Sequence, residues 1–205
     1  MQGLVITLPS EKREVILFGP PPKTKDDLRF LIKEKGIQCM INVCPFTNER
    51  ADDGTEKAQK YMGFCAPDEK RPENTLHVRL IRLPFDASSF EATGRTKELK
   101  KIDLAQFYIS HVKLIEKTIE KEKVVGNIYI HSTTGVTEEA YLAIALWKLR
   151  NHSSKMDFLN WIRENNYEWL FDDDNDKKEL LTFILNEVCR GHLKTNFFKK
   201  VKKDE

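Results

Sequence analysis

The chain has 205 residues, of which 40% are apolar and 10% aromatic, so it can bury a core and lacks the composition of a disordered protein. Its 34 Lys and Arg against 32 Asp and Glu leave a net charge of +2, which gives no general attraction to nucleic acid or membranes. The four cysteines show no CxxC pair and no Cys/His cluster at zinc spacing. We therefore expect no disulfide framework, no metal site and no cofactor.

The ends of the chain suggest its setting and its domain organisation. The first residues, MQGLVITLPSEKREV, lack the apolar stretch and cleavage site of a secretory signal, and no window approaches the ~18 apolar residues of a membrane span. We expect a soluble intracellular protein, cytoplasmic or nuclear. We also expect one domain over residues 1–192 and a lysine-rich tail over residues 193–205.

The first part of the chain predicts two strands, a helix and a third strand. Residues 3–8 and 14–18 are short β-branched runs separated by a polar turn. Thr24 or Asp26 can cap a helix that ends near Gly36. A buried strand, QCMINV, follows directly.

The middle of the chain predicts a long connection, a strand and a helix. Residues 44–74 are polar and broken by Gly and Pro, as in a surface connection. Residues 76–83 predict a strand. Residues 103–121 predict an amphipathic helix, because apolar side chains recur there at helical spacing.

The last part predicts a strand that leads through a tight turn into a helix. Residues 124–130 are strongly strand-like, and an apolar helix is expected over residues 140–147. Two more helices are expected around residues 161–170 and 177–188, joined by the acidic turn DDDND. Strands that alternate with helices predict an α/β domain with a central sheet.

The stretch IYIHSTTGVTEEAYLAIALW resembles the signature loop of the protein tyrosine and dual-specificity phosphatases. In that family a strand ends in His-Cys, five residues follow, and an Arg opens a helix. His131 matches the His, and Gly135 and Val136 match the usual Gly-Val. Ser132 stands where the Cys belongs, and Glu138 stands where the Arg belongs.

The order of elements extends the resemblance over residues 15–188. ILFGPPPKTKDDLRFLIKEKGIQCMINV is similar to the family's opening, RLIRLPFDASSF to its general-acid loop, and LTFILNEV to its closing helix. The resemblance implies a cysteine-phosphatase-like fold with a mixed sheet of about five strands flanked by helices. It also places Asp86 at the general-acid position.

The two substitutions imply a degenerate phosphate loop without catalytic residues. A serine hydroxyl is far less acidic than a cysteine thiol, and a carboxylate at position 138 reverses the charge that would hold phosphate. We therefore expect an inactive member of the family, a pseudophosphatase. The degenerate loop comprises His131, Ser132, Thr133, Thr134, Gly135, Val136, Thr137 and Glu138.

Two function classes follow from this resemblance. The first is a noncatalytic scaffold, competitor or structural protein whose partner is another protein or a second copy of the chain. The alternative is a weakly active phosphatase or an RNA 5'-triphosphatase relative that uses Asp86 and a hydroxyl nucleophile.

The same residues also permit structural interpretations. The loop can be an ordinary strand-to-helix turn with Thr137 as the N-cap and Glu138 and Glu139 in the first helical turn, where either carboxylate can satisfy the helix dipole. Asp86 can cap the SSF turn, which we favour over an acid role when no nucleophile is present.

Two further segments have features of a binding or active site. The tail interleaves Phe197 and Phe198 with lysines and could bind nucleic acid or an anionic membrane, although a solvated tail is favoured. CAPDEKR at residues 65–71 has Cys-x5-Arg spacing, but it lacks the preceding strand, the glycine and the following helix. We reject it as an active site.

Overall fold

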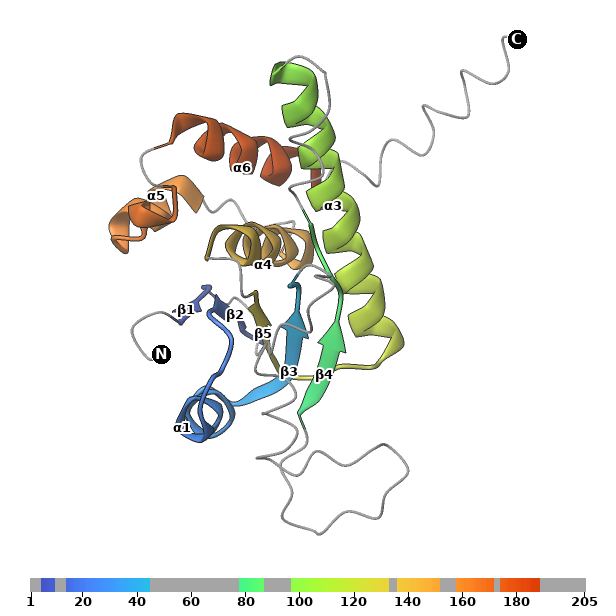
Figure 1. The fold of residues 1–205 in the computed structure, drawn as a ribbon, viewed down its shortest axis with the longest axis vertical. Coiled ribbons are helices and arrows are strands. Elements are labelled where there is room, and N and C mark those ends of the chain that lie inside the picture. Colours follow the sequence, from blue (N-terminus) through green and yellow to red (C-terminus); the bar gives the residue numbers. More distant parts are fainter. Residues whose placement is uncertain are drawn as a thin grey trace, which may run out of the picture.

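The structure is a computed structural model that describes residues 5–9, 14–44, 78–86, 97–132, 136–151, 158–171 and 174–188. Within these ranges, a five-stranded mixed sheet lies between helices (Figure 1). The sheet confirms the predicted α/β class and strand number. Its strands, in the spatial order β1-β2-β5-β3-β4, are β1 (Ile6–Thr7), β2 (Ile16–Gly19), β5 (Asn127–His131), β3 (Ile37–Asn42) and β4 (Arg79–Arg82).

The four longer strands run in the same direction. β1 is antiparallel to β2, whereas β2, β5, β3 and β4 are parallel neighbours. Gly19 and Asn42 both pair with His131, and Asn42 also pairs with Arg82, so the carboxyl ends of the four strands are level. The segments that follow these strands therefore begin at one edge of the sheet, where α/β proteins commonly place their sites.

Helices and helical turns follow the predicted order. The first is α1 (Lys25–Arg29), which continues as the π-helix η2 (Phe30–Glu34). The others are α3 (Lys97–Lys121), α4 (Val136–Arg150), α5 (Phe158–Glu164), the 3-10 helix η4 (Glu168–Phe171) and α6 (Asn175–Val188). The prediction for α3 started too late, at residue 103, because four of the first six residues of the helix are charged and weaken the apolar pattern there.

The helix predicted around residues 161–170 is broken into α5 and η4. Asn166 has a left-handed backbone with φ of 57°, which ends α5. Two hydrogen bonds close the end: Tyr167 N donates to Ile162 O at 2.9 Å and Asn166 N to Arg163 O at 3.1 Å. This is a Schellman cap, and Asn tolerates the left-handed position better than most residues.

Alternating side chains of the strands build a separate core on each face of the sheet. Ile128 and Ile130 of β5 face α3, α4 and α6, whereas Tyr129 faces α1 and η2. Figure 1 shows the corresponding layers, with α4 across one face and α1 on the other. A run of buried residues in β5 thus serves both cores, as expected of a central parallel strand.

Asn127 anchors the start of β5. Its Oδ1 accepts a hydrogen bond from Val15 N at 3.0 Å, and its Nδ2 donates to Lys35 O at 2.8 Å. One side chain thereby ties β5 to the segment before β2 and to the end of η2. These bonds fix the position of β5 relative to its neighbouring strands, and so the position of the residues that follow it.

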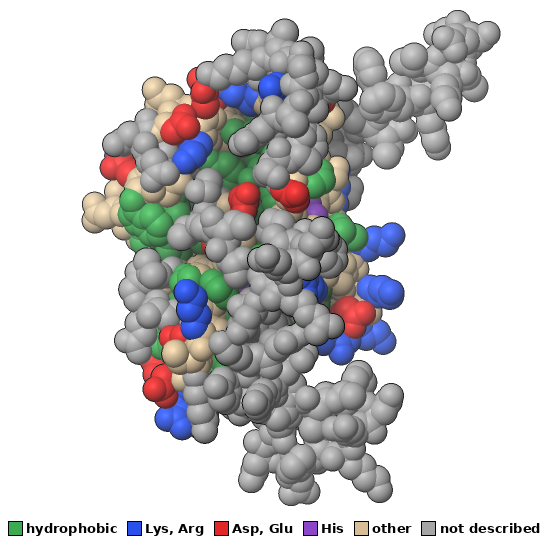
Figure 2. All heavy atoms as spheres, in the orientation of Figure 1, with side chains coloured by type: hydrophobic (Ala, Val, Ile, Leu, Met, Phe, Trp, Pro, Cys, Tyr) green, Lys and Arg blue, Asp and Glu red, His purple; other side chains and the backbone are tan. Residues whose placement is uncertain are grey.

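The described surface carries charges of both signs. Figure 2 shows basic side chains along the edge where α3 lies, with a carboxylate among them. Among the described residues, no helix combines the length and apolar character needed to cross a membrane. The predicted connection beyond Cys44, the boundary at residue 192, the lysine-rich tail and the CAPDEKR segment lie outside the described residues.

Candidate functional site

The predicted site residues that the structure describes lie at the edge of the sheet where the parallel strands end. Beyond β3, Val43 N donates a hydrogen bond to His131 O at 2.9 Å, and Phe85 N donates to Val43 O at 3.0 Å. The ladder therefore continues past the formal strand ends. It brings Ser132, which follows β5, and Asp86, which follows Phe85, to the same edge of the sheet.

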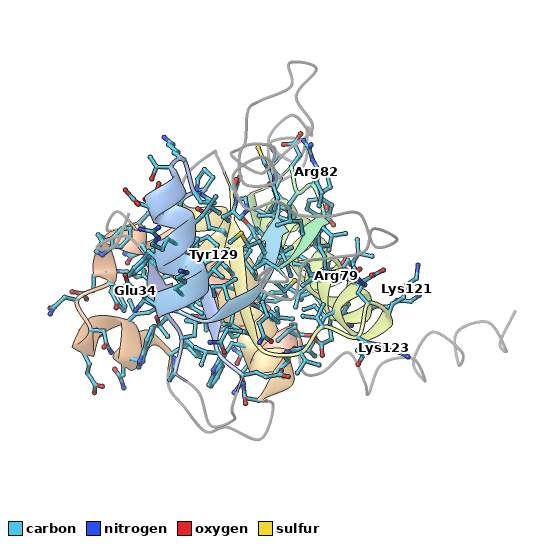
Figure 3. The ribbon with its side chains drawn as sticks, turned by 90° about the horizontal axis from the view of Figure 1, so that it is seen from below. Glu34, Arg79, Arg82, Lys121, Lys123 and Tyr129 are labelled. Carbon is cyan, nitrogen blue, oxygen red and sulfur yellow. The ribbon has the colours of Figure 1, made fainter. Side chains whose placement is uncertain are left out.

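His131 and Ser132 are buried, with exposed fractions of 1% and 2%. The His131 ring lies against Tyr129, with centroids 5.8 Å apart. Tyr129 in turn donates its hydroxyl hydrogen bond to Pro20 O at 2.6 Å, just beyond β2. Figure 3 shows Tyr129 beneath α1 and η2, so the strand that ends in Ser132 is held from this face as well.

The loop between Ser132 and α4 is described only at its two ends. Thr133, Thr134 and Gly135 lie outside the described residues, and Val136 and Thr137 are described as backbone of the first helical turn. α4 begins at Val136. Thr137 is therefore inside the helix, and the interpretation of Thr137 as its N-cap is wrong.

Two carboxyl groups occupy the first turn of α4. Glu138 is half-buried and stands at the position predicted for it, six residues after Ser132. Glu139 is fully buried, and no other residue donates a hydrogen bond to its carboxyl oxygens. Burial raises the pKa of Glu139 from an ordinary 4.5 to about 8; a weak interaction with its own backbone N–H opposes the increase, and the neighbouring charge of Glu138 adds to it.

The Glu139 carboxyl interacts electrostatically with two buried tyrosines. Burial raises the pKa of Tyr129, and the charge of Glu139 raises it further. Burial and then Glu138 raise the pKa of Tyr108 on α3, with a smaller effect of Glu139. The carboxyl of Glu139 thus lies within electrostatic reach of tyrosines on two different elements, one of them anchored at Pro20.

An aromatic cluster connects α3 to the end of β4 beside these carboxyls. Phe85 lies 4.5 Å from Tyr108 and 4.8 Å from Phe107, centroid to centroid, and Tyr108 lies 5.6 Å from Tyr141 of α4. His111 Nε2 bonds Leu83 O at 3.0 Å. The cluster fixes the backbone that carries Asp86, whereas the SSF turn that Asp86 could cap lies outside the described residues.

The described cysteines lie in the sheet and just beyond it. Cys39 and Cys44 are free thiols and both are buried. Burial raises the pKa of Cys39 to about 12, so this thiol is a poor nucleophile. In the same ranges, no three His, Cys, Asp or Glu side chains are close enough together to hold a metal ion.

A hollow of about 560 Å³ lies at the other end of α4, away from Ser132. Its lining includes three basic and three acidic side chains, which are Lys113, Lys117, Arg150, Glu14, Glu116 and Glu120. Arg150 pairs with Glu116 at 2.7 Å and with Glu14 at 2.9 Å. None of the predicted site residues lines this hollow, so we place the candidate site at Ser132.

Sequence reasoning singled out Ser132, Glu138 and Asp86 by resemblance and gave Glu139 only an alternative role at the helix start. The doublet Glu138-Glu139 was visible in the sequence. A period of 3.6 residues puts neighbours about 100° apart on a helix, so the two side chains face different directions and can differ in burial. Which one did so depends on how α4 packs on the sheet.

Comparison with known proteins supports the fold. No protein-family model matches the sequence, and no curated protein matches it significantly. The structure is similar to that of a DUF442 candidate phosphatase from Shewanella putrefaciens CN-32, with a TM-score of 0.51, 13% identity, and coverage of 91% of this chain and 90% of that chain. This similarity confirms the predicted phosphatase-like fold.

Two further solved structures match with lower scores. One is the catalytic core of Siw14, with a TM-score of 0.46, 13% identity, and coverage of 88% of this chain and 87% of that chain. The other is PTPMT1 in complex with PI(5)P, with a TM-score of 0.38, 15% identity, and coverage of 86% and 93%.

Proposed function

We propose that this chain is a catalytically inactive protein with a phosphatase-like fold, and that it acts by binding another protein as a scaffold or competitor. The observation that carries the proposal is the pair at the degenerate loop. Ser132 follows β5 where the resemblance expects the nucleophilic Cys, and Glu138 lies in the first turn of α4 where it expects the Arg.

The serine substitution removes the nucleophile. A cysteine thiol with an ordinary pKa near ~8.5 can be lowered to roughly 3.5–7.5 at a helix N-terminus or beside positive charge, which supplies a thiolate at neutral pH. A serine hydroxyl needs a general base to react. The Glu138 carboxylate in the adjacent first turn of α4 adds negative charge near the hydroxyl, which opposes its ionisation.

The glutamate substitution removes phosphate recognition. An arginine holds two phosphate oxygens with parallel charge-assisted hydrogen bonds, whereas a carboxylate repels the same dianion. Loss of one partner of a buried charge pair costs about 2 to 5 kcal/mol, before any repulsion is added. We therefore expect that the protein does not retain phosphorylated substrates as a Cys-to-Ser trap would.

The binding role rests on what remains after these losses. The packing of the described sheet, cores and helices does not depend on a catalytic group. The fold can therefore still present a surface to a partner. The partner we propose is another protein, such as a substrate of an active phosphatase, or a second copy of this chain.

Turnover assays test the proposal. Purified protein and a Ser132→Ala variant are compared on an aryl phosphate and on RNA with a 5'-triphosphate. We expect both proteins to release phosphate at the same background rate. Turnover by the natural chain that Ser132→Ala abolishes would contradict the proposal and favour the weakly active phosphatase or triphosphatase.

A further inference from the structure

A series of aromatic side chains around α5 and η4 reaches from the core to the surface. Trp147 and Phe158 are buried and lie 4.6 Å apart, centroid to centroid, and Phe158 lies 5.5 Å from Trp161. Trp161 in turn lies 5.5 Å from Tyr167, and both of these outer side chains are only partly buried. The outer rings are therefore supported by packed rings beneath them.

Trp169 continues this series into solvent. Its exposed fraction is 42%, which is high for a tryptophan, and it stands two residues after Tyr167 in η4. In the described ranges, its side chain forms no ring contact and no hydrogen bond. The neighbouring Leu170 is buried and its N–H donates to Tyr167 O at 3.0 Å, so the backbone that carries Trp169 is anchored. We call Trp161, Tyr167 and Trp169 the aromatic platform.

The charged side chains of α5 and η4 beside the aromatic platform are mostly acidic. Glu164 lies one helical turn after Trp161 and is exposed, with no ion pair among the described residues. Glu168 directly precedes Trp169 and is paired with Arg163 at 3.8 Å, but both side chains are exposed, so this pair is weak. Figure 2 shows hydrophobic side chains gathered on the surface where α5 lies, with acidic side chains beside them.

We propose that the aromatic platform is a docking surface for a basic segment of a partner protein, which places an arginine or lysine over the ring of Trp169. The inference rests on the proposed binding role, and it gives that role a surface and a partner chemistry. The face of an indole ring attracts cations, and the carboxylates of Glu164 and Glu168 favour the same charge. An acidic partner would be repelled by both carboxylates.

The construction of the platform also suits binding. Tryptophan, tyrosine and arginine are enriched among the residues that dominate the affinity of protein–protein interfaces. Because Trp161 and Tyr167 are already packed on the rings beneath them, little side-chain freedom is lost when a partner covers them.

Binding of model peptides to the full chain tests the proposal. The probe is a fluorescein-labelled peptide of alternating arginine and glycine, and its counterpart with glutamate in place of arginine is the charge control. We expect fluorescence anisotropy in low salt to show binding of the arginine peptide alone. Trp169→Ala should weaken this binding about fivefold and Glu164→Gln about twofold, because each removes one contact with the cations.

Two variants on α3 serve as matched controls. Leu114→Ala removes a similarly exposed apolar side chain, with an exposed fraction of 46%, and Glu120→Gln removes the charge of an exposed carboxylate. Neither should change the affinity for the arginine peptide. Far-ultraviolet circular dichroism checks that each variant folds.

Nuclear magnetic resonance locates the bound peptide on the natural chain. The chain has three tryptophans, and the indole N–H signal of Trp169 is the one that Trp169→Ala removes. Trp169→Phe identifies the same signal if the alanine variant unfolds. We expect the arginine peptide to shift the Trp169 signal and to leave the signal of the buried Trp147 in place.

Four results would overturn the inference. They are no binding of the arginine peptide, equal binding of the glutamate peptide, an affinity that Trp169→Ala lowers no more than Leu114→Ala does, and a Trp169 signal that moves with protein concentration when no peptide is present. The last result would make a second copy of the chain the occupant of this surface. The proposed lack of catalysis is tested by turnover, so either idea can fail without the other.

Discussion

The first turns of α1 and α4 have similar sequences but lie in opposite physical environments. α1 follows β2 and has Asp26 and Asp27 in its first turn, whereas α4 follows β5 and has Glu138 and Glu139 there. Each helix therefore places a pair of acids at the positive end of its dipole, where carboxylates are favourable. The two pairs differ in how their oxygens are satisfied.

The start of α1 is a complete capping box at the surface. Thr24 Oγ1 accepts from Asp27 N at 3.1 Å, and Asp27 Oδ2 accepts from Thr24 N at 3.0 Å and from Lys23 N at 3.1 Å. At the start of α4, by contrast, Glu139 is enclosed and no other residue donates a hydrogen bond to its carboxyl. An acid at a helix start is thus stabilising when solvent and backbone donors can reach it, whereas burial of Glu139 opposes its ionisation.

Tyr129 lies between the two helix starts. The pKa of its phenol is raised by burial first, then by Glu139 of α4, and then by Asp27 of α1. One hydroxyl therefore interacts electrostatically with an acid from each pair. Its hydrogen bond to Pro20 O fixes the segment between β2 and α1. Mutations at the two helix starts should separate what burial contributes from what capping contributes.

The largest expected effect is a dependence of stability on pH that comes from Glu139. Below pH 4.5 the group is protonated in both the folded and the unfolded chain. Between pH 4.5 and about 8, the unfolded chain holds a carboxylate in water while the folded chain keeps the proton, so the free energy of unfolding falls as pH rises. Above pH 8 the loss is complete and amounts to roughly 3 to 5 kcal/mol.

Glu139→Gln should remove this slope. We expect the variant and the natural chain to have similar stability in urea at pH 4, and the variant to be more stable by several kcal/mol at pH 9. The matched control is Glu138→Gln, whose side chain is only half-buried and should leave most of the slope in place. Parallel pH curves for the natural chain and E139Q would show that the burial of Glu139 has been misjudged.

The next effect concerns the satisfied helix start. Thr24→Ala removes the side-chain oxygen that accepts from Asp27 N, which should lower the free energy of unfolding by about 1 kcal/mol. Thr24→Ser keeps the hydroxyl and should lose much less. Chemical denaturation at a single pH is sufficient, and equal losses in the two variants would argue against the capping box.

The smallest effect is expected at Asp26, which is exposed in the first turn of α1. Asp26→Asn removes a charge that interacts favourably with the helix dipole and should lower stability by about 0.3 kcal/mol in low salt. Salt should reduce the difference, because exposed charges are screened over roughly 10 Å at 0.1 M ionic strength. A loss that is unchanged in 1 M salt would point to a specific contact of Asp26 instead.

Local patterns in the sequence were sufficient for most of the fold. The β-branched runs before Gly19 and around residue 129, the capping signal at Thr24 and the apolar spacing of α3 predicted these elements, because each depends on interactions within a few residues. The element boundaries failed where local signals were weak. α3 begins earlier than predicted, and Asn166 breaks the helix that was expected to run through it.

The order of residues alone gives a hydroxyl at Ser132 and a carboxyl at Glu138 in the segment that joins β5 to α4. That the adjacent Glu139 is the buried carboxyl follows from the fold, because burial depends on how α4 packs between the sheet, α3 and α6. The gathering of Ser132, Asp86 and the α4 start at one edge likewise comes from parallel strand pairing between segments far apart in the chain. Solvent exclusion and long-range pairing are properties of the assembled fold, and no short window of sequence contains them.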